Sequence, residues 1–134
     1  MQAVRLQVTS VTIGAPDPRE LARFYARLLD TELSASDPPR PGEPAEAGWA
    51  QLRSTSDHGR ITLNFEYERH YSAPRWPSEP GRQHSTQHLD IYVEDLESAT
   101  AWAVSCGATL ADIQPQSDVR VLYDPAGHPF CLFT

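Results

Sequence analysis

The chain has 134 residues, a formal net charge of −7 and a hydrophobic share of 40%. These values predict one globular domain, because a chain of this length buries roughly two-thirds of its unfolded surface on folding. The sequence has no basic stripe to neutralise phosphates, which argues against a nucleic-acid-binding protein. It also has no apolar run long enough to span a bilayer, which argues against a membrane-spanning protein.

The beginning of the chain predicts a strand followed by a helix. Residues 6–13 alternate between apolar and polar side chains, which is typical of a strand, and Pro16 ends it because proline lacks an amide donor. Asp17 can cap a helix that begins at Pro18 and ends at Leu29. This helix carries an apolar stripe at helical spacing, formed by Leu21, Phe24, Leu28 and Leu29.

Loops and strands alternate through the middle of the chain. Residues 34–48 contain four prolines and predict a surface loop. A short strand is expected over 49–53, a turn over 54–59 and a clearly alternating strand over 61–67. The side chains of that strand expected in the core are Ile61, Leu63 and Phe65. A second irregular segment, 71–85, follows.

The stretch from Gln87 to Leu96 organises the second half of the chain. It alternates, so a strand here separates its side chains onto two faces. The polar face is expected to hold His88, Asp90 and Tyr92, and the apolar face Leu89, Ile91 and Val93. Asp95 can cap a helix over 96–106 that Gly107 ends. The inward residues of this helix are expected to be Leu96, Ala99, Trp102, Ala103 and Cys106.

Three short strands complete the pattern. Residues 109–113 and 120–123 predict two of them. Asp124 to Gly127 then predicts a type I turn, because proline stands second and glycine fourth. The last strand is expected over 130–133.

The two halves match each other when Ser10 is set against His88, because Asp17 then meets Asp95 and the two helix caps coincide. Each half therefore predicts one βαβββ module within the single domain 1–134. The modules are residues 1–70 and 86–134, joined by the loop 71–85.

The arrangement predicts an α+β fold, with the helices outside and the two sheets facing inward around a cleft, because one helix covers only one face of each sheet. Mixed inner faces of this kind favour a small-molecule site, with Trp76 in the linking loop near its mouth. The candidate ligand-binding residues are Ser10, Thr12, Asn64, Glu66, Trp76, His88, Asp90, Tyr92 and Cys131.

Four motifs carry a resemblance to a known family. They are, in order, Asp17 to Tyr25, His88 to Asp90, Gly107-Ala108 and Asp124 to Gly127. Over nearly its whole length the chain resembles the vicinal oxygen chelate superfamily, also called the glyoxalase/bleomycin resistance/dioxygenase group. Its His-Leu-Asp strand and Gly-His-Pro-Phe-Cys ending are most similar to the glyoxalase-like subgroup common in actinobacteria. The resemblance implies paired βαβββ modules and a homodimer.

The resemblance also implies a divalent metal, held by a His on the first strand of each module and a Glu on a later strand. His88 matches this pattern, whereas Ser10 stands at the first-module His position and Cys131 at the second-module Glu position. The equivalent first-module place falls near Asn64, with Glu66 two residues further on. A catalytic metal normally keeps three protein ligands, so no metal cofactor is expected. If a metal does bind, His88 and Glu66 are the expected ligands, with Cys131 as a third donor.

Two functional hypotheses follow for the chain. In the first, the protein binds a small aromatic or polycyclic compound without a cofactor, as antibiotic-binding members of the superfamily do. In the second, it is a lyase, isomerase or dioxygenase-type enzyme in which His88, paired with Asp90 or Glu66, acts as general base or metal ligand. A structural alternative makes His88 a buried histidine bonded across the sheets. Neither nucleic acid nor a membrane is an expected partner, and a cytoplasmic location is expected because Met1 is not followed by a signal segment.

Overall fold

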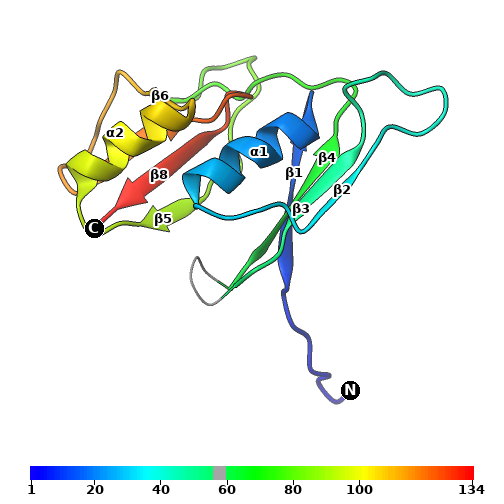
Figure 1. The fold of residues 1–134 in the computed structure, drawn as a ribbon. Coiled ribbons are helices and arrows are strands. Elements are labelled where there is room, and N and C mark those ends of the chain that lie inside the picture. The colour runs from blue at the N-terminus through cyan, green and yellow to red at the C-terminus, as the bar shows by residue number, and fades with distance from the viewer. Residues whose placement is uncertain (56–59) are drawn as a thin grey trace.

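The computed structural model describes residues 1–55 and 60–134, which form two four-stranded sheets and two helices (Figure 1). The first sheet has the order β1-β4-β3-β2 and comprises β1 (Ser10–Ala15), β2 (Ala35–Asp37), β3 (Trp49–Leu52) and β4 (Thr62–Tyr67). The second has the order β5-β8-β7-β6 and comprises β5 (Asp90–Tyr92), β6 (Thr109–Leu110), β7 (Val119–Tyr123) and β8 (Pro129–Phe133). Helix α1 (Pro18–Leu28) follows β1, and α2 (Leu96–Cys106) follows β5. The predicted α+β fold of two βαβββ modules is confirmed.

In each module the first strand pairs in parallel with the last, which sorts the side chains onto two faces. Thr12 lies beside Asn64 in the first sheet, and Asp90 lies beside Cys131 in the second. These polar residues project from the helix-free faces. The apolar alternates of the second module pack against the core as predicted, namely Leu89, Ile91 and Val93.

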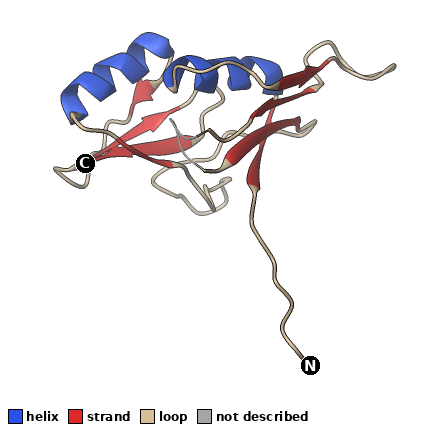
Figure 2. Ribbon diagram, turned by 60° about the horizontal axis from the view of Figure 1, so that its bottom comes forward, coloured by secondary structure: helices blue, strands red, loops and turns tan. Residues whose placement is uncertain are grey.

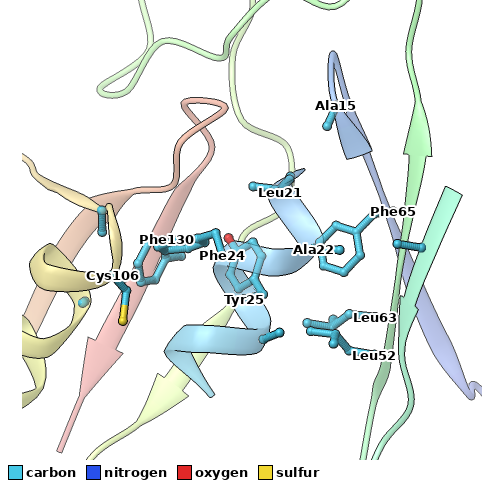
Figure 3. Packing of buried hydrophobic residues seen from close by; sticks show 14 of the residues in the cluster. Ala15, Leu21, Ala22, Phe24, Tyr25, Leu52, Leu63, Phe65, Cys106 and Phe130 are labelled. Carbon is cyan, nitrogen blue, oxygen red and sulfur yellow. The ribbon is translucent and has the colours of Figure 1, made fainter. Parts of the chain in front are cut away.

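Helix α1 lies at the centre of the core and contacts both modules (Figure 3). The Tyr25 ring stacks on Phe65 of the first module, with centroids 5.7 Å apart, and meets the Phe130 ring of the second at 6.1 Å. Phe24 packs against the same Phe130 ring at 6.1 Å. Burying each such phenylalanine contributes about 1.5–3 kcal/mol, so one helix stabilises both modules. Both helices lie on one side of the molecule (Figure 2), which leaves the opposite faces of the sheets for a site.

The helix ends follow the predicted signals. The Asp17 carboxylate accepts a hydrogen bond from the Glu20 amide at 3.1 Å, which satisfies one free donor of the first turn of α1. Asp95 occupies the predicted N-cap position before α2, but its carboxylate accepts from the Ser98 hydroxyl and not from a backbone amide of the first turn. Gly107 ends α2 with φ at 121°, a conformation that favours glycine.

Strand β1 begins later than the sequence pattern predicts. The expected strand covers 6–13, but pairing with β4 begins only where the Thr62 amide donates to the Thr9 carbonyl at 3.2 Å. The residues before Thr9 extend away from the body (Figure 1). Alternation alone cannot say where the neighbouring strand starts. The predicted turn over 54–59 falls partly outside the described residues, which omit 56–59.

Two apolar side chains predicted to be inward are more exposed than expected. Ile61 is 53% exposed, because it lies just before β4 at the rim of a cleft. Trp102 is 51% exposed and lies where the two helices meet, with its indole N–H donating to the Leu28 carbonyl at 3.0 Å. Trp102 thus bridges the helices instead of covering the second sheet. No helix among the described residues has the length and apolar character needed to cross a membrane.

Candidate functional site

A cleft of about 960 Å³ opens at the junction of the two modules. The edge strands of the two sheets, β1 and β5, both border it. Its lining includes residues 11–14 of β1, Tyr71 and residues 83–87 of the linking segment, residues 88–90, and Asp124, His128 and Pro129 of the second module. Its volume falls in the range of small-molecule sites, about 300–1,000 Å³.

Histidines are concentrated in this cleft. Four of the five histidines in the sequence line it, namely His70, His84, His88 and His128. Its carboxylates are Glu68, Asp90 and Asp124. The described residues that line the cleft include no Arg or Lys, so it carries no permanent positive charge. This lining can exchange hydrogen bonds with polar groups, and its fixed charge disfavours strongly anionic ligands.

His88 and Asp90 form an accessible polar pair in the wall of this cleft. The His88 Nε2 atom lies 3.1 Å from the Asp90 Oδ1 atom, and the two side chains are 48% and 59% exposed. The backbone here is fixed because the Leu89 carbonyl accepts from the Cys131 amide at 2.9 Å. His88 is therefore not the buried histidine of the structural alternative, and it pairs with Asp90, one of the two partners that the sequence offered for a general base.

The Cys131 thiol joins this pair. Its sulfur, the His88 imidazole and the Asp90 carboxylate each offer a donor atom, and the three atoms lie within 4.8 Å of one another. Partial burial and the nearby Asp90 carboxylate raise the pKa of the Cys131 thiol above its ordinary value. A raised pKa disfavours the thiolate, so Cys131 is poorly suited to act as a nucleophile.

The metal ligands implied by the superfamily do not come together in this chain. Ser10 offers no strong ligand at the first-module position, and Glu66 projects from the helix-free face of the first sheet beside Trp49. Among residues 1–55 and 60–134, the one group of three metal-ligating side chains is His88, Asp90 and Cys131, without Glu66. A centre drawn from both modules does not fit these residues, whereas a donor set from the second module does.

The other predicted ligand-binding residues lie in three places. Thr12 lines the cleft together with His88 and Asp90. The helix-free faces beyond the cleft carry Ser10, Asn64, Glu66, Tyr92 and Cys131. Trp76 lines a separate cavity of about 600 Å³, where its carbonyl accepts from the Tyr123 hydroxyl at 2.7 Å. Pro74 lines both cavities, so the second one adjoins the cleft.

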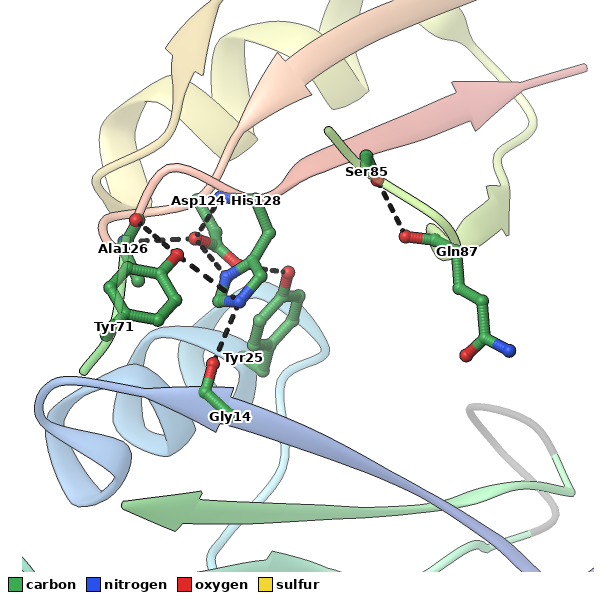
Figure 4. Close-up of polar contacts among 8 residues, drawn as sticks. All are labelled: Gly14, Tyr25, Tyr71, Ser85, Gln87, Asp124, Ala126 and His128. Carbon is green, nitrogen blue, oxygen red and sulfur yellow. Dashed lines mark hydrogen bonds and ion pairs between the residues drawn. The ribbon is translucent and has the colours of Figure 1, made fainter. Parts of the chain in front are cut away.

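A second His–Asp pair, absent from the sequence prediction, lies at the inner end of the cleft (Figure 4). The Asp124 carboxylate is buried, 2.9 Å from His128 Nδ1, and accepts from the Tyr25 hydroxyl at 2.8 Å. It also accepts from the Ala126 and His128 amides of the turn. Burial and the Asp124 carboxylate raise the pKa of Tyr25 well above its ordinary value.

This pair ties the two modules together. His128 Nε2 lies 2.9 Å from the Gly14 carbonyl of β1, and the Tyr71 hydroxyl donates to the Ala126 carbonyl at 2.7 Å. Both ring nitrogens of His128 face acceptors, so both contacts are hydrogen bonds only when each nitrogen carries a proton. Gly127 allows the linking segment to approach, since a Cβ there would lie 2.9 Å from Ala73 Cβ. One sequence signal could have revealed the network: a tyrosine on the buried stripe of a helix needs a partner for its hydroxyl.

The linking segment also makes short local contacts as it enters β5. The Ser85 hydroxyl donates to the Gln87 carbonyl at 2.9 Å, immediately before His88 (Figure 4). Arg75 and His84 form an isolated parallel bridge further back in the segment. These contacts shape the part of the segment that lines the cleft.

Comparisons with known proteins agree with the fold. Residues 10–133 match the model of a family described as glyoxalase-like domain. No curated protein matches the chain. Among solved structures, the fosfomycin resistance protein FosX from Mesorhizobium loti is 13% identical with a TM-score of 0.66, over 98% of this chain and 93% of that one.

Two further solved structures are similar in the same way. The glyoxalase family protein from Enterococcus faecalis is 20% identical with a TM-score of 0.65, over 96% of this chain and 97% of that one. TnmS3, an antibiotic binding protein from Streptomyces sp. CB03234, is 16% identical with a TM-score of 0.60, over 98% of each chain. At these identities the likeness concerns the fold.

Proposed function

Because the chain belongs to the glyoxalase-like domain family of the vicinal oxygen chelate superfamily, we propose that it is a small-molecule binding protein of the glyoxalase/bleomycin resistance type. The observation that carries this proposal is the cleft of about 960 Å³, with the exposed His88 and Asp90 pair in its wall. A structural neighbour described as an antibiotic binding protein supports the same function. The protein acts without the metal centre that other members of the superfamily draw from both modules.

The ligand that fits this lining is an uncharged or cationic compound with an aromatic part. The cleft offers three carboxylates and, among its described lining residues, no Arg or Lys. A phosphonate or similar anion would therefore lack a permanent positive partner. Tyr71 in the cleft and Trp76 in the adjoining cavity offer aromatic surface for stacking.

A thermal-shift screen with uncharged, cationic and anionic aromatic compounds tests this proposal, followed by calorimetric titration of each hit. His88→Ala is expected to weaken binding by about 1–3 kcal/mol, the cost of losing a buried polar contact with the ligand. Trp76→Ala should also weaken it. Glu97→Gln, at an exposed position on α2, is the matched control and should bind as the parent does. If His88→Ala and Trp76→Ala both bind a hit as tightly as the parent, the site lies elsewhere.

A second candidate function is a metal-independent enzyme in which His88 acts as general base. The 3.1 Å contact between His88 Nε2 and Asp90 Oδ1 favours it, because a carboxylate bonded to an imidazole fixes the orientation of the ring. Conversion of a bound hit by the parent, lost in Asp90→Asn with the affinity retained, would support the enzyme. Binding without conversion would favour the binding protein.

We further propose that the protein works as a cytoplasmic homodimer. The segment before β1 alternates, and its apolar side chains Val4, Leu6 and Val8 are 77–87% exposed. An alternating exposed segment of this kind is suited to pair with an open sheet edge of a second copy. Light scattering at micromolar concentration should give twice the chain mass of 14.9 kDa, and Leu6→Asp should halve it. A parent that scatters as a monomer would contradict the dimer.

A further inference from the structure

We propose that His88, Asp90 and Cys131 form a site for a thiophilic divalent cation of the zinc class, built from the second module alone. The inference goes beyond the proposed small-molecule function and does not depend on it. The sequence predicts no metal cofactor because it counts ligands across both modules and omits Asp90. The structure supplies Asp90 as the third donor.

The backbone brings these three side chains together. Strands β5 and β8 lie side by side (Figure 1), and Asp90 is the direct partner of Cys131 in their parallel register. Partners in neighbouring strands project from the same face, with the strands about 4.8 Å apart. His88 lies two residues before Asp90, and the bond from the Cys131 amide to the Leu89 carbonyl extends the ladder to that point. All three side chains therefore leave one face of the second sheet.

The distances between the donor atoms suit a cation. Bonds from zinc to nitrogen, oxygen and sulfur measure about 2.0–2.3 Å, so ligands at tetrahedral angles lie about 3.3–3.8 Å apart. The His88 and Asp90 atoms are 3.1 Å apart, and all three donor atoms lie within 4.8 Å of one another. These separations are close to those of ligands that share one ion.

The chemistry of the donors selects the class of cation. Imidazole, carboxylate and thiolate are the three ligand types that zinc accepts, and a sulfur ligand disfavours magnesium, calcium and manganese. The free Cys131 is a thiol, so the cation would displace its proton to solvent as the metal–sulfur bond forms. Three protein ligands leave one coordination position for water or another molecule. His88 and Asp90 line the cleft, so the cation would lie at its wall.

Access to the site also favours binding. The side chains of His88 and Asp90 are about half exposed, so a hydrated ion can reach them from solvent. Cys131 is partly buried, beside Val121 of β7. The other thiol, Cys106, is only 8% exposed and belongs to the core cluster, so it provides a natural control.

Titration of the metal-free full chain with Co²⁺ tests the site, because a cobalt–thiolate bond gives an intense near-ultraviolet charge-transfer band. We expect one equivalent of Co²⁺ to produce this band and Zn²⁺ to displace it. Cys131→Ser should abolish the band, and Cys106→Ala should keep it. His88→Ala and Asp90→Asn should each weaken cobalt binding at least about tenfold, since even changes outside the first coordination shell cost 10–100-fold.

Each other outcome overturns the proposal. No cobalt binding by the parent would mean that this donor set does not hold the ion. Cobalt binding without the charge-transfer band would mean the same, and His70 and His84 would then be the first alternative ligands. A charge-transfer band that persists in Cys131→Ser would also show that this donor set does not hold the ion. If Cys131→Ser fails to fold, alkylation of the parent replaces it: Zn²⁺ should protect Cys131 from iodoacetamide, and unchanged alkylation would contradict the site. The test uses no organic ligand, so its failure leaves the proposed function standing.

Discussion

The molecule contains two His–Asp pairs with similar contact distances and very different surroundings. His88 and Asp90 lie 3.1 Å apart on an edge strand and are about half exposed. His128 and Asp124 lie 2.9 Å apart across a turn, with the Asp124 side chain fully buried. Both pairs line the cleft, but only the second makes further hydrogen bonds to β1, α1 and the linking segment.

The comparison teaches that burial, more than residue type, decides what such a pair can do. A buried charged group must keep its partners, because removing one leaves an uncompensated charge in a medium of low dielectric. An exposed pair gains little from its own attraction, since water and salt screen it. The buried pair, His128 and Asp124 (the inner pair), is therefore fixed as a connection between the modules. The exposed pair, His88 and Asp90 (the outer pair), is free to bind a ligand or an ion.

The largest expected effect is a loss of folding stability when the inner pair is broken, which distinguishes it from the outer pair. Asp124→Ala should lower the free energy of unfolding by about 3–5 kcal/mol, because it removes the hydrogen-bond partner of the Tyr25 hydroxyl and of the His128 ring. Urea denaturation at neutral pH measures the change. Asp118→Ala, at an exposed position of the same module, is the control and should change stability by less than about 0.5 kcal/mol. Equal losses in the two variants would show that the inner pair does not connect the modules.

A pH dependence should also report the buried network around Asp124. Burial and Asp124 raise the pKa of Tyr25, so the folded state keeps a proton that the unfolded chain releases above pH 10. The stabilisation is complete below pH 10 and is lost as the pH rises from 10 toward the folded-state pKa. Between pH 10 and the folded-state pKa, the free energy of unfolding should fall by about 1.4 kcal/mol per pH unit.

Urea denaturation at pH values from 8 to 11 measures this slope. Tyr25→Phe should remove that part of the slope while lowering stability at neutral pH through the lost hydrogen bond. Phe24→Leu, on the same helix, should lower stability without changing the slope. An unchanged slope in Tyr25→Phe would exclude Tyr25 as the group responsible.

The smallest expected effect concerns the outer pair. Asp90→Ala should change the free energy of unfolding by less than about 0.5 kcal/mol, because it removes an exposed contact. The same variant is expected to lose cobalt binding, so one substitution separates the two roles. A loss of stability close to that of Asp124→Ala would mean that the outer pair is structural as well.

Local signals in the sequence determined most of the fold. The alternation around His88 placed polar side chains on one face of a strand and apolar ones under a helix, and Asp17, Asp95 and Gly107 marked helix ends. These features depend on residues a few positions apart, where strand geometry and free backbone donors act directly. The match between the halves then implied two modules of the same order.

Only the tertiary structure decided which distant residues meet. The parallel register of β5 and β8 set Cys131 beside Asp90, and the packing of α1 between the modules brought Tyr25 to Asp124. Glu66 and Trp76 did not join His88 in the cleft, because a strand pattern gives the face of a side chain but not its neighbours across the fold. Such contacts depend on how the sheets and loops pack together. For that reason the sequence identified Asp124 only as the first residue of a turn, whereas the structure shows that it belongs, with His128, to a connection between the two modules.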